Sequence, residues 1–143
     1  MNARVYRRAL ALLVPALGML AGATMVATPA QAAPQCTVTY TAGGWDATGN
    51  FPAGFIGTFT VTNNTATVTE GWRVEVHYRT GVEVLQNWNA VKLLDVDPTY
   101  VFGETSFNRE IGPGRSIEFG VQARKTANNV SNYPRSAVCA LLF

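Results

Sequence analysis

Residues 71–79 read GWRVEVHYR, and apolar and polar side chains alternate along this stretch without a break. Because successive side chains of a β-strand point to opposite faces of a sheet, the pattern predicts a strand with one buried and one exposed face. The residues expected to face the core are Trp72, Val74, Val76 and Tyr78. The charged residues and the histidine between them are expected to face water.

The same alternation recurs at residues 36–41, 55–62 and 116–122. Turn-forming residues separate the apolar runs, and they are Gly43-Gly44, Asn63-Asn64, Thr80-Gly81, Asp97-Pro98, Gly112-Pro113-Gly114 and Asn128-Asn129. No stretch after residue 32 carries the 3.6-residue apolar period of an amphipathic helix. We therefore expect an all-β domain. Its architecture would be a two-sheet antiparallel β-sandwich of the immunoglobulin-like or jelly-roll type, with a short closed barrel as the alternative.

The N-terminal segment, residues 1–32, is typical of a secretion signal. Three arginines among the first eight residues precede an apolar run at 9–27, and Ala30-Gln31-Ala32 matches the small-residue pattern of signal cleavage. An uncleaved membrane anchor is the alternative interpretation of this run. We expect a secreted, extracellular protein with a single domain at residues 33–143.

The charge balance limits the kind of partner. The chain has 11 Lys and Arg and 9 Asp and Glu, but three of the basic residues lie in the expected signal, which leaves a net charge of −1. No basic cluster in the remaining chain is longer than Arg124-Lys125. The composition therefore argues against binding to nucleic acid or to a membrane surface, and it favours an uncharged partner. We expect a monomer.

Two cysteines, Cys36 and Cys139, lie near the two ends of the expected domain. In an exported protein such a pair is most simply one disulfide, which places the first and last strands side by side. The chain-entropy estimate for a loop of this length is on the order of 4 to 5 kcal/mol. A two-thiol metal site is the alternative, but His77 is the single histidine and a tetrahedral site would lack ligands.

Catalytic motifs are not evident. His77 lies mid-strand on the polar face, and no serine lies in a nucleophile-elbow motif. A glycosidase needs two opposed carboxylates, one of them with a raised pKa, and a domain of this size offers no second layer to shield such a pair from water. We therefore expect no catalytic residue, no metal site and no cofactor.

Several aromatic residues lie in polar surroundings instead of in an alternating strand. Trp88 is flanked by amides at Gln86, Asn87 and Asn89. Three further aromatics with turn-like or small polar neighbours are Trp45, Phe51 and Phe107. A flat ring can stack on the C–H face of a sugar while neighbouring amides bond its hydroxyls, so this combination suits sugar recognition. The alternative is that these rings lie at the rim of the core.

An ordered set of short motifs, taken together, resembles the bacterial cellulose-binding module of family 2. The motifs are Cys36-x-Val38-x-Tyr40, Gly54-Phe55, Val61-Thr62-Asn63, Gly71-Trp72, Trp88-Asn89-Ala90, Gly112-Pro113-Gly114 and Cys139. The resemblance implies a β-sandwich whose disulfide joins the two ends and whose Gly-Trp tryptophan, here Trp72, is buried. It also implies a flat strip of three exposed tryptophans that lies on crystalline cellulose, with related modules binding chitin or xylan.

Transferring that strip residue by residue gives one clear match and two altered positions. Trp88 matches the second tryptophan, Phe107-Asn108 stands at the third, and either Trp45 or Phe51 stands at the first because of an insertion of about six residues. The flanking polar positions are Gln86, Asn87, Glu118 and Gln122, with a carboxylate at Glu118 where an amide is usual and Thr58 where an Asn is common.

The sequence thus predicts a secreted, non-catalytic module that binds an insoluble β-linked polysaccharide, cellulose first and chitin or xylan second. The alternative is a secreted protein-interaction or cell-surface domain that uses the same aromatic patch.

Overall fold

The computed structural model describes residues 32–45, 53–127 and 129–143, and of Trp45 it describes the backbone alone. The expected signal, apart from Ala32, and Phe51 lie outside the described residues. No helix in the described ranges is long and apolar enough to cross a membrane.

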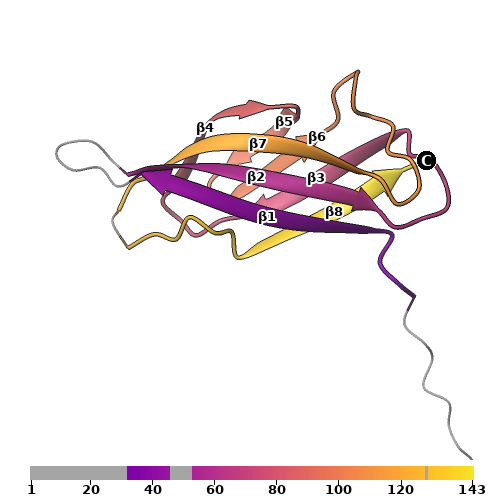
Figure 1. Cartoon of the computed structure of the whole chain (residues 1–143). Coiled ribbons are helices and arrows are strands. Elements are labelled where there is room, and N and C mark those ends of the chain that lie inside the picture. The colour runs from indigo at the N-terminus through magenta and orange to yellow at the C-terminus, as the bar shows by residue number, and fades with distance from the viewer. Residues whose placement is uncertain (1–31, 46–52, 128) are drawn as a thin grey trace, which may run out of the picture. The chain divides into compact units, whose positions relative to one another are not determined.

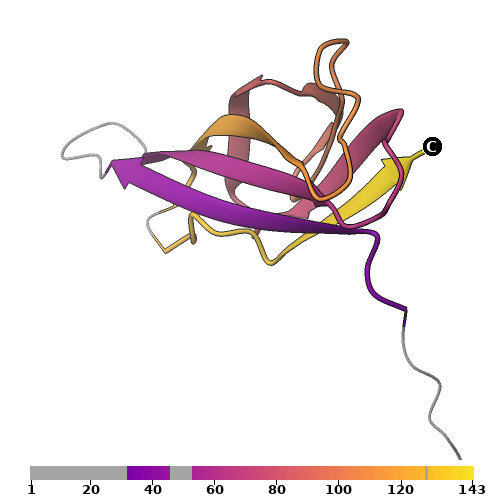
Figure 2. The ribbon, with the colours of Figure 1, turned by 45° about the vertical axis from the view of Figure 1, so that its right-hand side comes forward.

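Eight strands form the domain, as expected for an all-β chain (Figure 1). They are β1 (Cys36–Trp45), β2 (Gly54–Asn63), β3 (Gly71–His77), β4 (Val82–Trp88), β5 (Val91–Val96), β6 (Thr99–Gly103), β7 (Ser116–Lys125) and β8 (Ser136–Leu142). The first sheet has the order β1-β2-β7-β4 and the second has the order β5-β6-β3-β8, and the pairs are antiparallel. The turned view in Figure 2 shows the two layers, which confirm the predicted β-sandwich.

The core lies between the two sheets and is lined with alternate residues of each strand, as the sequence predicted for β3. Trp72 and Tyr78 are 0% and 1% exposed. Trp72, on the second sheet, stacks on Phe119 of the first sheet with ring centroids 5.3 Å apart, and Phe119 stacks on Phe59 at 4.8 Å. Buried aromatic area of this kind supplies much of the stabilisation of a small sandwich.

The disulfide joins Cys36 at the start of β1 to Cys139 in β8, with an S–S distance of 2.06 Å and 103 residues of separation. Because β1 and β8 are edge strands of different sheets, this bond connects the two layers at one side of the sandwich. The predicted pairing is therefore confirmed, and so is the predicted proximity of the first and last strands.

Tyrosines fill one part of the core, and the hydroxyl groups of two of them are bonded to backbone carbonyls. Tyr40 donates to the carbonyl oxygen of Asn132 at 2.7 Å, and Tyr100 donates to that of Val82 at 2.7 Å. Burial raises the pKa of Tyr40 to about 12, and it raises the pKa of Tyr78 further. These phenols are therefore neutral structural groups at physiological pH.

Candidate functional site

The outer face of the first sheet, which we call the platform face, is built by the residues that alternate with the core residues. On β7 the side chains of Phe119, Val121 and Ala123 are buried, so the residues between them point outward. The outward positions on the four strands include Thr37, Thr39, Thr41, Gly43, Ile56, Thr58, Thr60, Thr62, Glu83, Gln86, Trp88, Ser116, Glu118, Gly120, Gln122 and Arg124. Apart from the charged Glu83, Glu118 and Arg124, this face is neutral.

Trp88 lies on this face and is 41% exposed, as the resemblance predicted. It pairs in register with Gly120 of β7. A Cβ added to Gly120 would stand 2.0 Å from Cζ2 and 2.1 Å from Cε2 of Trp88, so the indole occupies the space directly above this glycine. One side of the ring therefore rests on the strand while the ring remains open to solvent. Gly120 was not identified from the sequence, although a glycine inside a strand often marks such a close approach.

A β-bulge explains why Trp88 points outward. Val82 and Val84 of β4 are buried, and strict alternation from them would also bury Trp88. The register between β4 and β7 shifts between Val84 and Gln86, which inserts Leu85 as an extra residue. Such a bulge turns the following side chains to the opposite face. Gln86 and Trp88 consequently face solvent together.

Two amides lie beside the indole. Gln86 and Gln122 are direct partners across β4 and β7, two residues along the strands from the pair of Trp88 and Gly120. Gln86 is exposed and Gln122 is half-buried. Each amide can donate and accept hydrogen bonds, so the pair offers polar partners next to an aromatic surface.

Asn87 is placed differently from its neighbours. It pairs with the buried Val121, and its Nδ2 donates to the carbonyl oxygen of Ala90 at 2.6 Å. Between them Asn89 has a positive φ of 58°, a left-handed conformation that asparagine tolerates well. Asn87 therefore holds the connection from β4 to β5, and its side chain is directed away from the platform face.

Glu118 is exposed on the platform face, two residues before Gly120. Its partner on β2 is Thr60, whose hydroxyl donates to Oε1 of Glu118 at 3.2 Å. The other charged side chains on this face, Arg124 and Glu83, bond each other through Nε and Oε2 at 2.7 Å. Within the described ranges Glu118 takes part in no ion pair.

Phe107 projects from the connection between β6 and β7 and is 73% exposed. The next residue, Asn108, is 8% exposed and fixes this connection through several bonds. Its Nδ2 donates to the carbonyl oxygen of Asn89 at 2.7 Å, and its carbonyl oxygen accepts from Nε1 of Trp72 at 2.9 Å. Asn108 thus places Phe107 next to the turn that follows Trp88.

Of the two candidates for the first aromatic position, Phe51 lies outside the described residues. The backbone of Trp45 pairs with Gly54 at the end of β2, which itself pairs with Arg124. The backbone of Trp45 therefore lies at the edge of the platform face that is level with Arg124 of β7. Glu118 lies near the other end of that strand.

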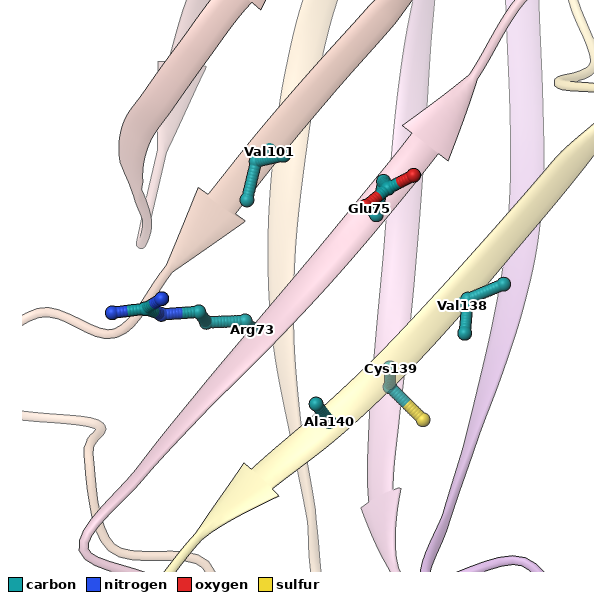
Figure 3. Close-up of a pocket in the computed structure, with 6 residues that line it drawn as sticks. All are labelled: Arg73, Glu75, Val101, Val138, Cys139 and Ala140. Atoms are coloured by element: carbon teal, nitrogen blue, oxygen red, sulfur yellow. The ribbon is translucent and has the colours of Figure 1, made fainter.

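The outer face of the second sheet carries a shallow hollow, shown in Figure 3 and lined by Arg73, Glu75, Val101, Val138, Cys139 and Ala140. None of these lining residues is aromatic. Close to it, His77 bonds Glu75 through Nε2 at 2.6 Å and Thr99 through Nδ1 at 3.0 Å, so both ring nitrogens have structural partners. Among the described residues no group of three or more His, Cys, Asp or Glu could hold a metal ion.

Comparisons with known proteins identify the family of this chain. Residues 36–139 match the family described as the cellulose binding domain. A cellulose/chitin binding protein of Mycobacterium tuberculosis (strain ATCC 25618 / H37Rv) is 32% identical over 118 residues, which cover 82% of this chain and 75% of that protein. Chitinase C of Streptomyces lividans is 34% identical over 101 residues, and these cover 71% of this chain but only 15% of the chitinase.

Among solved structures, the cellulose-binding family 2 carbohydrate binding domain from ScLPMO10C superimposes with a TM-score of 0.56 at 24% identity. The overlap covers 77% of this chain and 99% of that domain, and it shows the same fold. The family match extends from one cysteine of the disulfide to the other and includes Trp72, Trp88 and Gly120. The chain therefore belongs to the cellulose binding domain family.

Proposed function

We propose that this chain binds an insoluble β-linked polysaccharide, cellulose or chitin, on its platform face and does not cleave it. The observation that carries the proposal is the position of Trp88 over Gly120, with Gln86 and Gln122 beside it. An exposed indole can stack on the C–H face of a sugar ring while the amides bond its hydroxyl groups. The names of the relatives, which mention cellulose and chitin, support this ligand class.

The contacts would extend from Trp88 along a strip. Phe107 would add a second ring next to the turn after Trp88. A third would come from Trp45, whose backbone lies at the edge of the platform face, or from Phe51, which lies outside the described residues. Gln86, Gln122 and Glu118 would supply polar contacts, whereas Asn87 is assigned to the turn. Because the platform face belongs to a sheet and not to a cleft, it suits a chain that lies on a solid surface.

The placement of the carboxylates supports a binding role without catalysis. On the described part of the platform face the acidic residues are Glu83 and Glu118. Glu83 pairs with Arg124, which is six residues along β7 from Glu118, or about 20 Å at the usual rise of a strand. Glycosidases place their two carboxyl groups about 5 to 9.5 Å apart across the scissile bond. The expected N-terminal signal would direct the module out of the cell, where such polysaccharides are found.

The test is the substitution Trp88→Ala. We expect binding to microcrystalline cellulose or chitin particles to fall about ten-fold or more, because a central aromatic contact is removed. The melting temperature should stay nearly unchanged, since the ring is partly exposed. Depletion of the protein from solution by the washed solid measures binding.

Phe143→Ala is the matched control, because Phe143 is an exposed aromatic that follows β8 of the other sheet. This variant should bind as the parent does. Failure of the parent to bind any of the solids would overturn the proposal and favour the protein-interaction alternative. Equal binding by Trp88→Ala and the parent would place the site elsewhere.

A further inference from the structure

We propose that Glu118 makes the platform face select chitin chains that carry free amines, that is, partly deacetylated chitin, over fully acetylated chitin and cellulose. This inference rests on the proposed function and names the chemical class of its ligand more closely. The neutral part of the platform would bind any β-linked chain, and Glu118 would distinguish chains with a positive charge.

The position of Glu118 carries the argument. It faces outward two residues before Gly120, so it lies about 6.6 Å along β7 from the glycine that supports Trp88. A sugar stacked on the indole would therefore place a neighbouring unit of the same chain near the carboxylate. Thr60 bonds Oε1, whereas Oε2 has no protein partner among the described residues.

Glu118 forms no ion pair with any charged side chain in the described ranges. Arg124 is about 20 Å away along the strand, beyond the Debye length of about 8 Å at physiological salt, and it is bonded to Glu83. The side chains nearest in register on β2 and β7 are Thr60 and Ser116, and β4 contributes Trp88 and Gln86. None of these side chains titrates between about pH 6 and about pH 9.

The loop between β6 and β7 contains the other charged residues close to Glu118 in sequence. Arg115 has its Cγ 3.5 Å from the place of a Cβ on Gly112, so its stem follows the turn at residues 112–114. Arg109 donates through Nε to the carbonyl oxygen of Glu70 at 3.0 Å. Glu110 is exposed in the same loop. Glu118 therefore presents a carboxylate that has no ion-pair partner among the described residues, and its neighbours on β2 and β4, Thr60 and Trp88, are neutral.

A deacetylated glucosamine unit presents an ammonium group at mildly acidic pH. An ammonium and a carboxylate form a hydrogen-bonded ion pair, whereas a hydroxyl or an acetamide donates to the carboxylate without a positive charge of its own. Because Glu118 is exposed, we expect the modest effect of a surface ion pair, about a two- to five-fold gain in affinity. An amide at this position would bond all these glycans alike.

The experiment compares one batch of partly deacetylated chitin particles with the same batch after chemical re-acetylation, and it includes microcrystalline cellulose. Binding isotherms are recorded at about pH 6 and about pH 9, at low salt and at high salt. We expect the parent to bind the amine-bearing particles about two- to five-fold more tightly at about pH 6 and low salt. The preference should disappear at about pH 9, where the amine loses its charge, and it should decrease at high salt.

Glu118→Gln should abolish the preference, so that its affinities for the amine-bearing and the re-acetylated particles become equal at about pH 6 and low salt. Glu75→Gln is the matched control, since it removes an exposed carboxylate from the outer face of the other sheet and changes net charge equally. It should keep the preference. Equal binding of both particle types by the parent, or an undiminished preference in Glu118→Gln, would overturn this inference and leave the proposed function intact. Absence of binding to every solid would instead refute the proposed function.

Discussion

Two tryptophans lie on opposite sides of the same strand and occupy different environments. Trp72 is 0% exposed and stacks on Phe119 between the sheets, whereas Trp88 is 41% exposed and lies over Gly120 on the outside of the first sheet. Phe119 and Gly120 are consecutive residues of β7, so their side-chain positions point to opposite faces. Inside the sandwich, the ring of Phe119 supports the indole of Trp72. Outside it, the missing side chain of Gly120 leaves room for the indole of Trp88.

Together with the proposed function, the comparison assigns stability and binding to different sides of one strand. The interior side contributes buried aromatic area, and the outer side leaves aromatic area exposed, at a position where a ligand can cover it. The two sides are connected through Asn108, whose carbonyl oxygen accepts from Trp72 and whose Nδ2 bonds the turn after Trp88. Substitutions at these positions should separate the two properties.

The largest effect is expected for Trp72→Ala. Removal of this buried ring should lower the free energy of unfolding by roughly 3 to 5 kcal/mol, a sizeable part of the roughly 5 to 15 kcal/mol typical of a domain. Urea unfolding followed by circular dichroism measures the loss. Under conditions where the variant remains folded, we expect it to retain binding to the solid polysaccharide. A small change in unfolding free energy would contradict the structural role of Trp72.

A smaller effect is expected for Gly120→Ala, which should weaken binding and leave the stability of the fold unchanged. The new Cβ would stand 2.0 Å from Cζ2 of Trp88, so the indole must leave its place over the strand. We expect about two- to ten-fold weaker binding, which corresponds to the loss of one well-placed aromatic contact, with little change in melting temperature. Gly43→Ala is the control, because a Cβ there meets no atom within 4 Å. Unchanged binding in Gly120→Ala would show that the exact position of the indole is unimportant.

The fold could be predicted from sequence because its signal is local. Alternation along residues 71–78 predicted the burial of Trp72 and Tyr78, and both are buried. The pair of cysteines, together with the expected secretion signal, predicted the disulfide, because a paired disulfide is the usual state of two cysteines in a secreted domain.

The candidate site could not be predicted from the alternation of apolar and polar residues alone. Alternation from Val84 would bury Trp88, and the bulge at Leu85 that reverses this direction depends on pairing with β7 and not on the local sequence of β4. The resemblance to a known family supplied the exposed position instead. Asn87 looked equivalent to Gln86 because both are amides beside Trp88, yet consecutive strand residues point to opposite faces, and Asn87 bonds the turn through Nδ2.

The smallest effect is expected for Phe107→Trp. This substitution tests whether the proposed binding strip extends beyond Trp88 to the connection between β6 and β7. Phe107 is 73% exposed and is held beside the turn after Trp88 by the bond from Asn108 to Asn89. If the ring is part of the strip, an indole there offers a larger stacking surface, and affinity for the solid polysaccharide should rise about two-fold. Phe107→Ala should lower affinity by a similar factor.

Both Phe107 variants should keep the parent melting temperature, since little burial changes. Depletion isotherms measured side by side resolve such differences, and equal affinities for Trp, Phe and Ala at this position would confine the binding contacts to Trp88 and its neighbouring amides.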